Sequence, residues 1–375
     1  MIEGGGVELR HRIDGPDDAP LLVLGPSLGT TTHLWDPQIS ELTRTWRVLR
    51  YDLPGHGASP ATKRSFGIDD LADEVLALAG PGRFAVGGVS LGGAVALSIA
   101  VRHPDQVSEL VLCCTAARFG EPASWRERAA RVRAEGTNWL AGIVTARWFT
   151  PGIEPEVAEP VQASLLGTDT ESYALACDAI AEFDLRDHLP KVTARTLVIA
   201  GDRDPATPVA QAELLAERIP RARLAVVQDA AHLANVERAS TVTELMTRFL
   251  GHGHGMKVRR EVLGEAYVDR ALTSGLTADF QEFITRYAWG EIWTRPGLDR
   301  RTRSVITLTA LVSRGHLDEL ALHLRAALRN GLTPDEIGEV LLQTAIYCGV
   351  PAANAAFGVA SRVLREAEAG EDAEG

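Results

Sequence analysis

A serine between glycines is the residue in this sequence best suited to nucleophilic chemistry. Ser90 lies in a Gly-Val-Ser-Leu-Gly stretch, after an apolar run at 84–89 and before a helical stretch that begins at Leu91. Small neighbours permit a sharp strand-to-helix turn that holds the hydroxyl clear of the backbone. A helix-capping serine is the alternative, but the strand before it and the helix after it favour a nucleophile.

A serine hydroxyl is a weak nucleophile at neutral pH, so a base and an orienting carboxylate are expected elsewhere in the chain. His232 follows the last strand-type run of the first 250 residues, and Asp204 follows the run before it. Asp202 competes for the role of the acid, but Asp204 lies farther into its loop. His188 and His56 are weaker candidates for the base, and we favour loop bracing by hydrogen bonds for His56.

An ester-cleaving serine also needs two N–H donors for the oxyanion of its tetrahedral intermediate. The residue after the nucleophile, Leu91, supplies one backbone N–H. An early loop at 25–30 follows an apolar run, and Leu28 is its expected donor. The alternative interpretation of this loop is a plain strand-to-helix turn.

The elements that must position these residues follow an alternating pattern. Helical stretches separate six strand-type apolar runs, at 21–24, 47–51, 84–89, 109–113, 196–200 and 223–227. Such alternation predicts an α/β fold, a mostly parallel sheet covered by helices. Residues from about 115 to 190 are helical in pattern and rich in tryptophan, which indicates a helical lid inserted into the sheet domain.

The sequence changes character after residue 250, so a boundary is expected there. Residues 1–250 form the α/β domain, and the glycine-rich stretch at 251–257 is expected to be a linker that no helix or strand would keep. From 258 to 366 apolar residues recur at helical spacing, which predicts an all-α domain. Residues 367–375 are expected to be a disordered tail.

The charge balance excludes some partners. With 38 Lys and Arg against 50 Asp and Glu, the formal net charge is −12, which repels nucleic acids and anionic lipid surfaces. No apolar run is long enough to span a membrane and no leader pattern is seen, so we expect a cytoplasmic protein. The four cysteines lack metal-ligand spacing, and no metal site is expected. The amphipathic helical domain is expected to form a homo-oligomer that buries its apolar faces.

Three loops carry a resemblance to a known family. These are Pro-Ser-Leu-Gly-Thr at 26–30 followed by Trp35, Tyr-Asp-Leu-Pro-Gly-His-Gly at 51–57, and Gly-Asp-Arg-Asp-Pro-Ala-Thr-Pro at 201–208. With them, the first 250 residues resemble the α/β-hydrolase superfamily and, within it, the 3-oxoadipate enol-lactonases. The chain order Ser90, Asp204, His232 is that of the superfamily. Arg118 or the lid tryptophans are candidates to bind the free carboxylate of such a substrate.

The second domain resembles the γ-carboxymuconolactone decarboxylase family. The resemblance rests on the stretch 293–304, on Glu319 with His323, and on the stretch 347–353. Relatives with peroxidase activity carry a C-x-x-C pair, whereas this domain has only Cys348, so thiol-disulfide chemistry is not expected.

The resemblance implies roles for particular residues of this second domain. Decarboxylation at the γ-carbon of an unsaturated lactone sends the electron pair into the lactone carbonyl, so no cofactor is needed. His323 is the candidate acid and Glu319 its orienting partner, because their spacing places both on one helix face. A surface ion pair is the alternative. Arg295, Arg301 and Arg303 are candidates to hold the carboxylates, although a solvated arginine face is also consistent with them.

Together the two resemblances imply a bifunctional enzyme of the protocatechuate branch of the β-ketoadipate pathway. It would convert 4-carboxymuconolactone to 3-oxoadipate enol-lactone and then to 3-oxoadipate, so its ligands are small lactone dicarboxylates. One rival is a generic serine carboxylesterase with a non-catalytic helical oligomerisation domain. Others are a cofactorless haloperoxidase and a non-enzymatic receptor on the same fold, the latter disfavoured by the complete triad.

Overall fold

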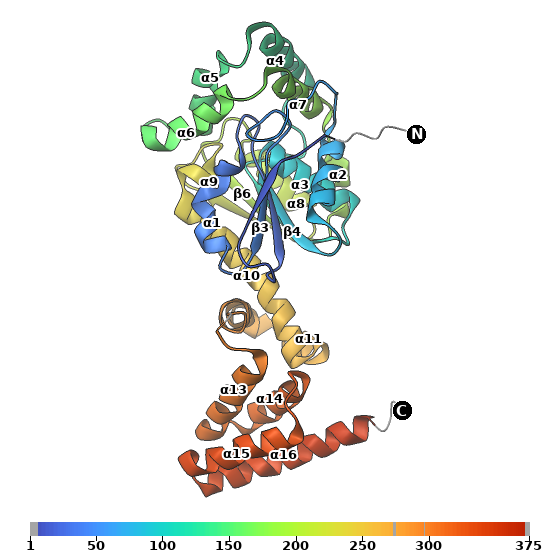
Figure 1. The fold of residues 1–375 in the computed structure, drawn as a ribbon, viewed down its shortest axis with the longest axis vertical. Helices are drawn as coiled ribbons and strands as arrows, with labels where there is room; N and C mark the ends of the chain where they lie inside the picture. The colour runs from blue at the N-terminus through green and yellow to red at the C-terminus, as the bar shows by residue number, and fades with distance from the viewer. Residues whose placement is uncertain (1–6, 273–274, 296, 372–375) are drawn as a thin grey trace. The chain divides into compact units, whose positions relative to one another are not determined.

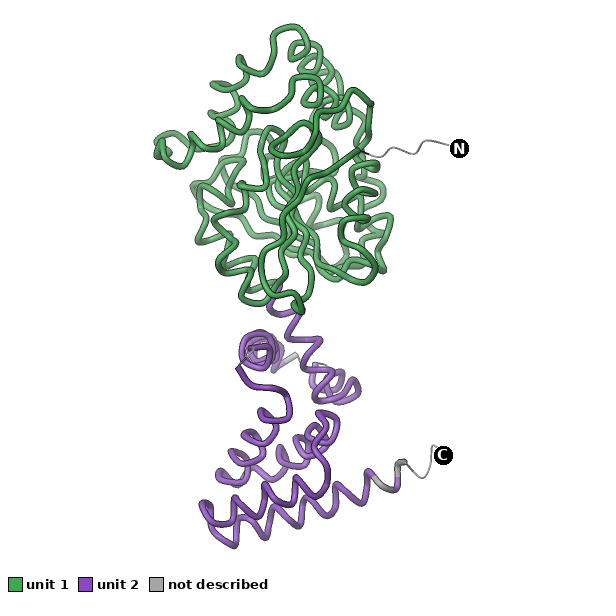
Figure 2. The backbone as a smooth tube through the Cα atoms, in the orientation of Figure 1, with its two compact units in different colours: residues 1–249 green, residues 250–375 purple. Residues whose placement is uncertain are grey.

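The computed structural model describes residues 7–272, 275–295 and 297–371. The chain divides into two compact units, Met1–Phe249 and Leu250–Gly375 (Figure 2). Each unit has its own hydrophobic core, and each is described by itself below. Among the described residues, no helix combines the length and the apolar character needed to cross a bilayer.

The first unit is built on a seven-stranded sheet in the order β1-β3-β2-β4-β5-β6-β7. Its strands are β1 (His11–Asp14), β2 (Leu21–Gly25), β3 (Arg47–Tyr51), β4 (Phe84–Val89), β5 (Val107–Cys113), β6 (Arg195–Gly201) and β7 (Ala222–Val227). All neighbours pair in parallel except β1, which runs antiparallel to β3. The α/β class predicted from the sequence is confirmed. The edge strand β1 was not predicted, because it is short, largely exposed and without an apolar run.

Helices cover both faces of this sheet. Figure 1 shows α2 (Ile68–Ala79), α3 (Leu91–Arg102) and α8 (Val209–Arg218) on one face, with α1 (Asp36–Leu42) and α9 (Ala234–Glu237) on the other. The central strand β4 is buried along its whole length, and most of α3 is buried beside it. The loop between β4 and α3 is therefore fixed by the densest part of the core.

A helical lid is inserted between β5 and β6 (Figure 1). It comprises α4 (Pro122–Glu135), α5 (Leu140–Trp148), α6 (Pro155–Leu166), α7 (Thr170–Glu182) and the short 3₁₀ helix η2 (Arg186–Lys191). Arg133 of α4 donates to Glu171 and Asp178 of α7, at 3.0 and 2.8 Å, and so joins two lid helices. A second 3₁₀ helix, η1 (Thr32–Trp35), leads into α1.

The glycine-rich stretch at 251–257 is helical, and the expectation of a non-helical linker is wrong. Helix α10 (Ala239–Leu263) runs through it without a break. A Cβ atom on Gly255 would collide with the backbone of Thr285 and Gly290, which belong to the π-helical element η4 (Thr285–Ile292). Glycine in a helix costs roughly 1 kcal/mol relative to alanine, but here the absent side chain permits two helices to touch, and tertiary packing overrides propensity.

The described part of the second unit contains only helical elements, as predicted. After α10 come α11 (Glu265–Leu272), η3 (Gly275–Thr277), α12 (Ala278–Ile284), η4, α13 (Arg300–Arg314), α14 (Leu317–Arg329), α15 (Pro334–Cys348) and α16 (Val350–Glu371). Buried residues of α13 to α16, Leu308, Leu324, Leu341 and Val363 among them, form one core cluster. A second cluster joins α10, α11, η4 and α14.

The expected disordered tail is also corrected in part. Helix α16 continues to Glu371, beyond the expected end of the domain at 366, while residues 372–375 lie outside the described part of the chain. Alanine and glutamate dominate the segment after 366 and are both strong helix formers.

Candidate active site

The turn that carries Ser90 is strained in the way a nucleophile turn requires. Ser90 has φ 55° and ψ −115°, a conformation that non-glycine residues rarely adopt. Its N–H donates to Cys113 O at 3.0 Å, and its carbonyl accepts from the Thr115 hydroxyl at 2.7 Å. A Cβ atom on Gly92 would collide with the backbone of Gly25, so β2 and the start of α3 approach as closely as glycine permits.

His232 and Asp204 form a buried pair beside this turn. His232 Nδ1 lies 2.8 Å from Asp204 Oδ2, and the two residues are only 5 % and 4 % exposed. The carboxylate also accepts from the N–H groups of Ala206 and Thr207, at 2.7 and 3.0 Å, and from the Thr207 hydroxyl at 2.6 Å. Burial alone would raise the pKa of Asp204, but His232 and Thr207 together hold it below its usual value. Asp204 therefore stays ionised and fixes the imidazole.

The other residues considered for the acid and the base do not take part in this pair. Asp202 accepts from the N–H of Ala230 at 3.1 Å, a contact that braces the loop before His232. His188 is exposed on η2. His56 is fully buried and bonded to the backbone of two loops, so its geometry fits the bracing interpretation.

The expected oxyanion donors lie on two elements that are joined to each other. Leu91 is the first residue of α3, where a backbone N–H has no partner within the helix. The N–H of Gly92 donates to Pro26 O at 2.9 Å and so ties this helix start to the early loop. Leu28, in that loop, lines the same cavity as Ser90. This arrangement can present both N–H groups to a developing oxyanion.

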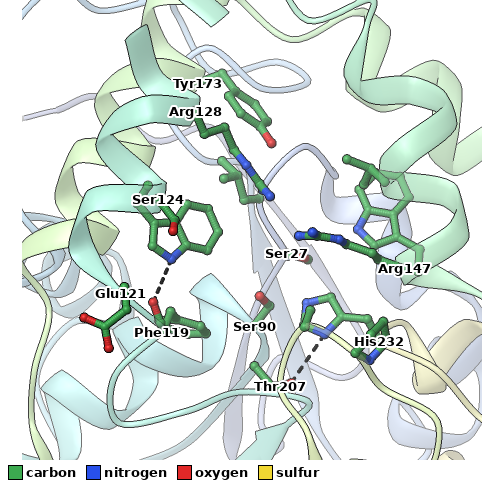
Figure 3. Close-up of a pocket in the computed structure, with 17 residues that line it drawn as sticks. Ser27, Ser90, Phe119, Glu121, Ser124, Arg128, Arg147, Tyr173, Thr207 and His232 are labelled. Atoms are coloured by element: carbon green, nitrogen blue, oxygen red, sulfur yellow. Dashed lines mark hydrogen bonds between the residues drawn. The ribbon is translucent and has the colours of Figure 1, made fainter. Parts of the chain in front are cut away.

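The cavity above Ser90 has a volume of about 240 Å³ and is lined on one side by lid residues. Its walls include Ser90, His232, Leu28, Trp148 and two lid arginines, Arg128 of α4 and Arg147 of α5. Figure 3 shows both guanidinium groups pointing into the space above Ser90. A pair of cations facing a nucleophile can hold an anionic group of a substrate in a fixed position.

Sequence reasoning did not find these arginines. Arg118, the residue considered for this role, instead pairs with Glu121 at 3.2 Å. The sequence contained one weak signal, because Arg128 follows Trp125 by three residues and its guanidinium lies 4.6 Å from the centre of that ring. Which way a lid helix faces is decided by its packing, so spacing alone could not have selected Arg128 and Arg147.

The second candidate pair lies on α14. Glu319 is exposed and His323 is half-buried one turn further on. Burial lowers the pKa of His323 to about 4, against a smaller opposing effect of the Glu319 charge. His323 is therefore neutral at neutral pH in the unliganded chain, and it can act as a hydrogen-bond partner or base unless a bound anion raises its pKa.

Comparisons with known proteins match the two units separately. Residues 20–172 match the alpha/beta hydrolase fold family, and residues 278–362 match the carboxymuconolactone decarboxylase family. The 3-oxoadipate enol-lactonase 2 of Acinetobacter baylyi is 35% identical over 253 residues, which cover 65% of this chain and 94% of that protein. The 4-carboxymuconolactone decarboxylase of the same organism is 49% identical over 114 residues, which cover 30% of this chain and 85% of that protein. This chain belongs to both families.

A solved structure supports the assignment of the hydrolase unit. The enol-lactonase from Burkholderia xenovorans LB400 matches with 41% sequence identity and a TM-score of 0.64, over 66% of this chain and 97% of that one. The resemblances seen in the sequence are confirmed, and the chain is an enzyme with a hydrolase unit and a decarboxylase-family unit.

Of the three arginines expected to bind carboxylates in the decarboxylase-family unit, two form hydrogen bonds within the protein and the third is exposed. Arg301 donates to Glu336 and to Gly331 O. Arg303 donates to Leu298 O at 3.2 Å and to Arg295 O at 2.8 Å, while Arg295 itself is exposed. A carboxylate role for Arg301 or Arg303 would require exchange of these partners.

Proposed function

We propose that this chain is a bifunctional enzyme of the protocatechuate branch of the β-ketoadipate pathway. Its decarboxylase-family unit would convert 4-carboxymuconolactone to 3-oxoadipate enol-lactone, and its hydrolase unit would open that lactone to 3-oxoadipate. The observation that carries the proposal is the Ser90, His232 and Asp204 arrangement beneath two lid arginines, in a chain that also contains a decarboxylase-family unit. The names of the relatives on both sides agree with it.

Ring opening begins with attack of Ser90 Oγ on the lactone carbonyl. His232 Nε2 takes the hydroxyl proton, because its Nδ1 is held by Asp204 at 2.8 Å and the opposite nitrogen is left for the serine. The oxyanion that forms is stabilised by the N–H groups of Leu91 and Leu28. Collapse of this intermediate breaks the bond between the carbonyl carbon and the ring oxygen.

The leaving group of this reaction is an enol oxygen on the same molecule. His232 returns its proton to that oxygen, and the enol then tautomerises to a ketone, leaving an acyl group on Ser90. A water molecule, deprotonated by His232, attacks the acyl carbonyl and releases 3-oxoadipate. The tautomerisation makes reclosure unfavourable, so the product is drawn toward the open chain.

Arg128 and Arg147 provide the specificity of this proposal. The enol-lactone carries an acetate group on the γ-carbon, on the other side of the ring oxygen from the reacting carbonyl. Two guanidinium groups across the cavity from Ser90 can bind that carboxylate while the carbonyl faces the serine. Because the whole chain carries a formal charge of −12, such local cations are needed to offset the repulsion of an anionic substrate.

Decarboxylation in the second unit needs a proton but no cofactor. Loss of CO₂ from the γ-carbon sends electrons through the ring double bond into the lactone carbonyl, and the α-carbon then takes a proton. His323 starts with a pKa of about 4, but a bound dicarboxylate beside it would raise that pKa and favour the protonated ring. His323 can therefore pick up a proton as substrate binds and deliver it after CO₂ leaves, with Glu319 adding to the same electrostatic effect.

The deciding experiment supplies 4-carboxymuconolactone to three proteins. Wild-type chain is expected to release CO₂ and 3-oxoadipate. Ser90→Ala is expected to release CO₂ and accumulate the enol-lactone, apart from its slow spontaneous hydrolysis, whereas His323→Ala is expected to release no CO₂ and still open added enol-lactone. Absence of CO₂ from the wild-type chain would overturn the bifunctional assignment and favour a carboxylesterase with a non-catalytic helical unit.

The helical unit is also proposed to assemble with further copies of itself. The apolar side chains of Leu342, Ile346, Tyr347 and Val350 are 56 %, 78 %, 79 % and 73 % exposed on α15 and the start of α16. Apolar surface of this kind is costly to leave in water. Light scattering is expected to give a mass above that of one 40.3 kDa chain, and Ile346→Lys should lower it. A monomeric wild-type chain at micromolar concentration would contradict the assembly.

A further inference from the structure

The lid and the loop of the proposed base are joined through their backbones. The N–H of His232 donates to Arg147 O at 3.3 Å, and the N–H of Leu233 donates to Trp148 O at 2.9 Å. The end of α5 therefore runs alongside the loop that carries the imidazole. Arg147 therefore has two roles, because its carbonyl accepts from the N–H of His232 and its guanidinium group enters the cavity.

A buried carboxylate completes this connection. Glu237, on the short helix α9, is 9 % exposed. Its Oε2 accepts from the N–H of Ala231 at 2.7 Å, and its Oε1 accepts from the N–H of Thr150 at 2.8 Å and from the Thr150 hydroxyl. The Glu237 side chain thus holds both the N–H of Ala231, the residue before His232, and Thr150, two residues after the end of α5.

The chemistry of these contacts requires a carboxylate. Two of the three donors are backbone N–H groups, which can only donate, and an ionised carboxylate offers acceptors on both oxygens. Hydrogen bonds to a charged acceptor are roughly twice as strong as neutral ones. An amide of the same shape would turn one NH₂ group toward an N–H donor and lose that contact.

The opposite side of the same main-chain segment, Ala230 and Ala231, is also restrained. The Cys114 thiol lies 3.8 Å from Ala231 O, and a Cβ atom on Gly201 would collide with the carbonyls of Ala230 and Ala231. The main chain before His232 therefore packs against the carboxyl ends of β5 and β6. Glu237 is the side chain that, beside the two backbone hydrogen bonds, links this packed segment to the lid.

We propose that Glu237 is a positioning residue that couples the lid to His232, so that the substrate-binding Arg147 and the base His232 keep one fixed separation. The inference rests on the proposed lactonase function of this site. A carboxylate held by Arg147 is then placed relative to the imidazole by main-chain contacts and by Glu237. Loss of Glu237 affects both groups together, although it touches neither substrate nor nucleophile.

The test compares Glu237→Gln with Glu244→Gln, a change to an exposed carboxylate on α10. Turnover is measured with 3-oxoadipate enol-lactone and with p-nitrophenyl acetate, a neutral ester, and Ser90 reactivity is followed by the labelling rate with a fluorophosphonate. For Glu237→Gln we expect kcat on both substrates and the labelling rate to fall about 10-fold or more, the scale of small misplacements of catalytic groups. The KM should rise for the anionic lactone and stay unchanged for the neutral ester.

A milder variant protects the test against misfolding. Thr150→Val removes only the hydroxyl donor and keeps the N–H, so it should give a smaller fall of the same kind, and Thr150→Ser should restore wild-type rates. If Glu237→Gln is unfolded by circular dichroism, the Thr150 series decides. Lower thermal stability with unchanged kcat and labelling rate in the folded variants would overturn the proposal and leave Glu237 a purely structural residue.

The outcome is separable from that of the proposed function. Wild-type chain that hydrolyses p-nitrophenyl acetate but not the enol-lactone would overturn the lactonase assignment alone. In that case the fall in kcat of Glu237→Gln could still be measured with the neutral ester, and the fall in its labelling rate with the fluorophosphonate. Equal rates for Glu237→Gln and wild type on that ester would overturn the coupling.

Discussion

His56 Nε2 accepts a hydrogen bond from the N–H of Gly29 at 3.1 Å, directly behind the loop that presents Leu28 to the cavity. Its Nδ1 lies 2.8 Å from Pro54 O, to which it donates. The ring is 0 % exposed, and burial lowers its pKa to about 4. A neutral imidazole with one fixed tautomer therefore supports the loop that carries Leu28.

Acid should destabilise the hydrolase unit through His56. Its pKa is lowered in the folded state from 6.5 to about 4, so the unfolded chain binds the proton first, and the free energy of unfolding should fall as pH drops from 6.5 toward 4. The fully developed loss is about 3 kcal/mol. Urea unfolding at pH 7 and pH 5 measures it. His56→Gln should be less stable at pH 7 and show a weaker pH dependence; an unchanged pH dependence would remove His56 as its cause.

Asp204 and Asp202 should differ sharply despite their proximity. Asp204→Asn keeps the shape but loses the charge and favours the wrong imidazole tautomer, which in triad enzymes costs about 10⁴-fold in kcat. Asp202→Asn keeps an oxygen that can accept from the N–H of Ala230 and loses only the charge assistance of that contact, so kcat should stay within about 10-fold of wild type. Steady-state hydrolysis of p-nitrophenyl acetate compares them. A larger loss for Asp202→Asn would assign the acid to that residue.

Arg128 and Arg147 should be needed for anionic substrates only. Replacement of either by glutamine removes a charge-assisted contact of roughly 1.5–3 kcal/mol, so kcat/KM for the enol-lactone should fall about 10- to 100-fold. Hydrolysis of a neutral ester should change little. Arg118→Gln is the matched control, because Arg118 pairs with Glu121 and does not itself line the cavity. Equal losses on neutral and anionic substrates would argue against carboxylate binding.

The titration of His323 can be observed directly. Burial lowers its pKa to about 4, and the Glu319 charge opposes this. Glu319→Gln should therefore lower the pKa further, and a bound dicarboxylate should raise it. The ring proton shifts of His323 in NMR spectra, followed from pH 8 to pH 4, measure this pKa in the unliganded wild type, in Glu319→Gln and in the wild type with a bound substrate analogue. A pKa near 6.5 in the unliganded chain would show that the ring is hydrated.

The two glycines one turn apart in α10 should respond oppositely to alanine. A Cβ atom on Gly255 would collide with the backbone of η4, whereas one on Gly251 would meet only the Arg286 side chain at 4.0 Å. Gly255→Ala should destabilise the helical unit by about 1–3 kcal/mol through overpacking. Gly251→Ala should be neutral or stabilising by up to about 1 kcal/mol, because alanine favours a helix. Chemical denaturation of both variants checks the order.

The sequence was sufficient where local pattern and chain order decide the structure. The run before Ser90 is apolar without interruption, and Asp204 and His232 each follow a strand-type run, so the parallel sheet and the pairing of His232 with Asp204 could be predicted together. It was insufficient where packing between distant segments decides. Glycine has a low helix propensity, and only the packing of η4 against Gly255 explains why a helix continues through it. Arg128 faces the cavity only because of the orientation of α4 in the lid.

The lid is an insertion between β5 and β6, and its contacts to the His232 loop are made largely by main-chain atoms, Arg147 O and Trp148 O among them. Main-chain contacts survive most amino-acid replacements. Mutation can therefore rewrite the inner surface of the lid, and with it the range of accepted molecules, while the bond-breaking machinery stays intact. The residues that break the bond and the lid residues that select the substrate therefore lie on separate stretches of one gene and can change separately.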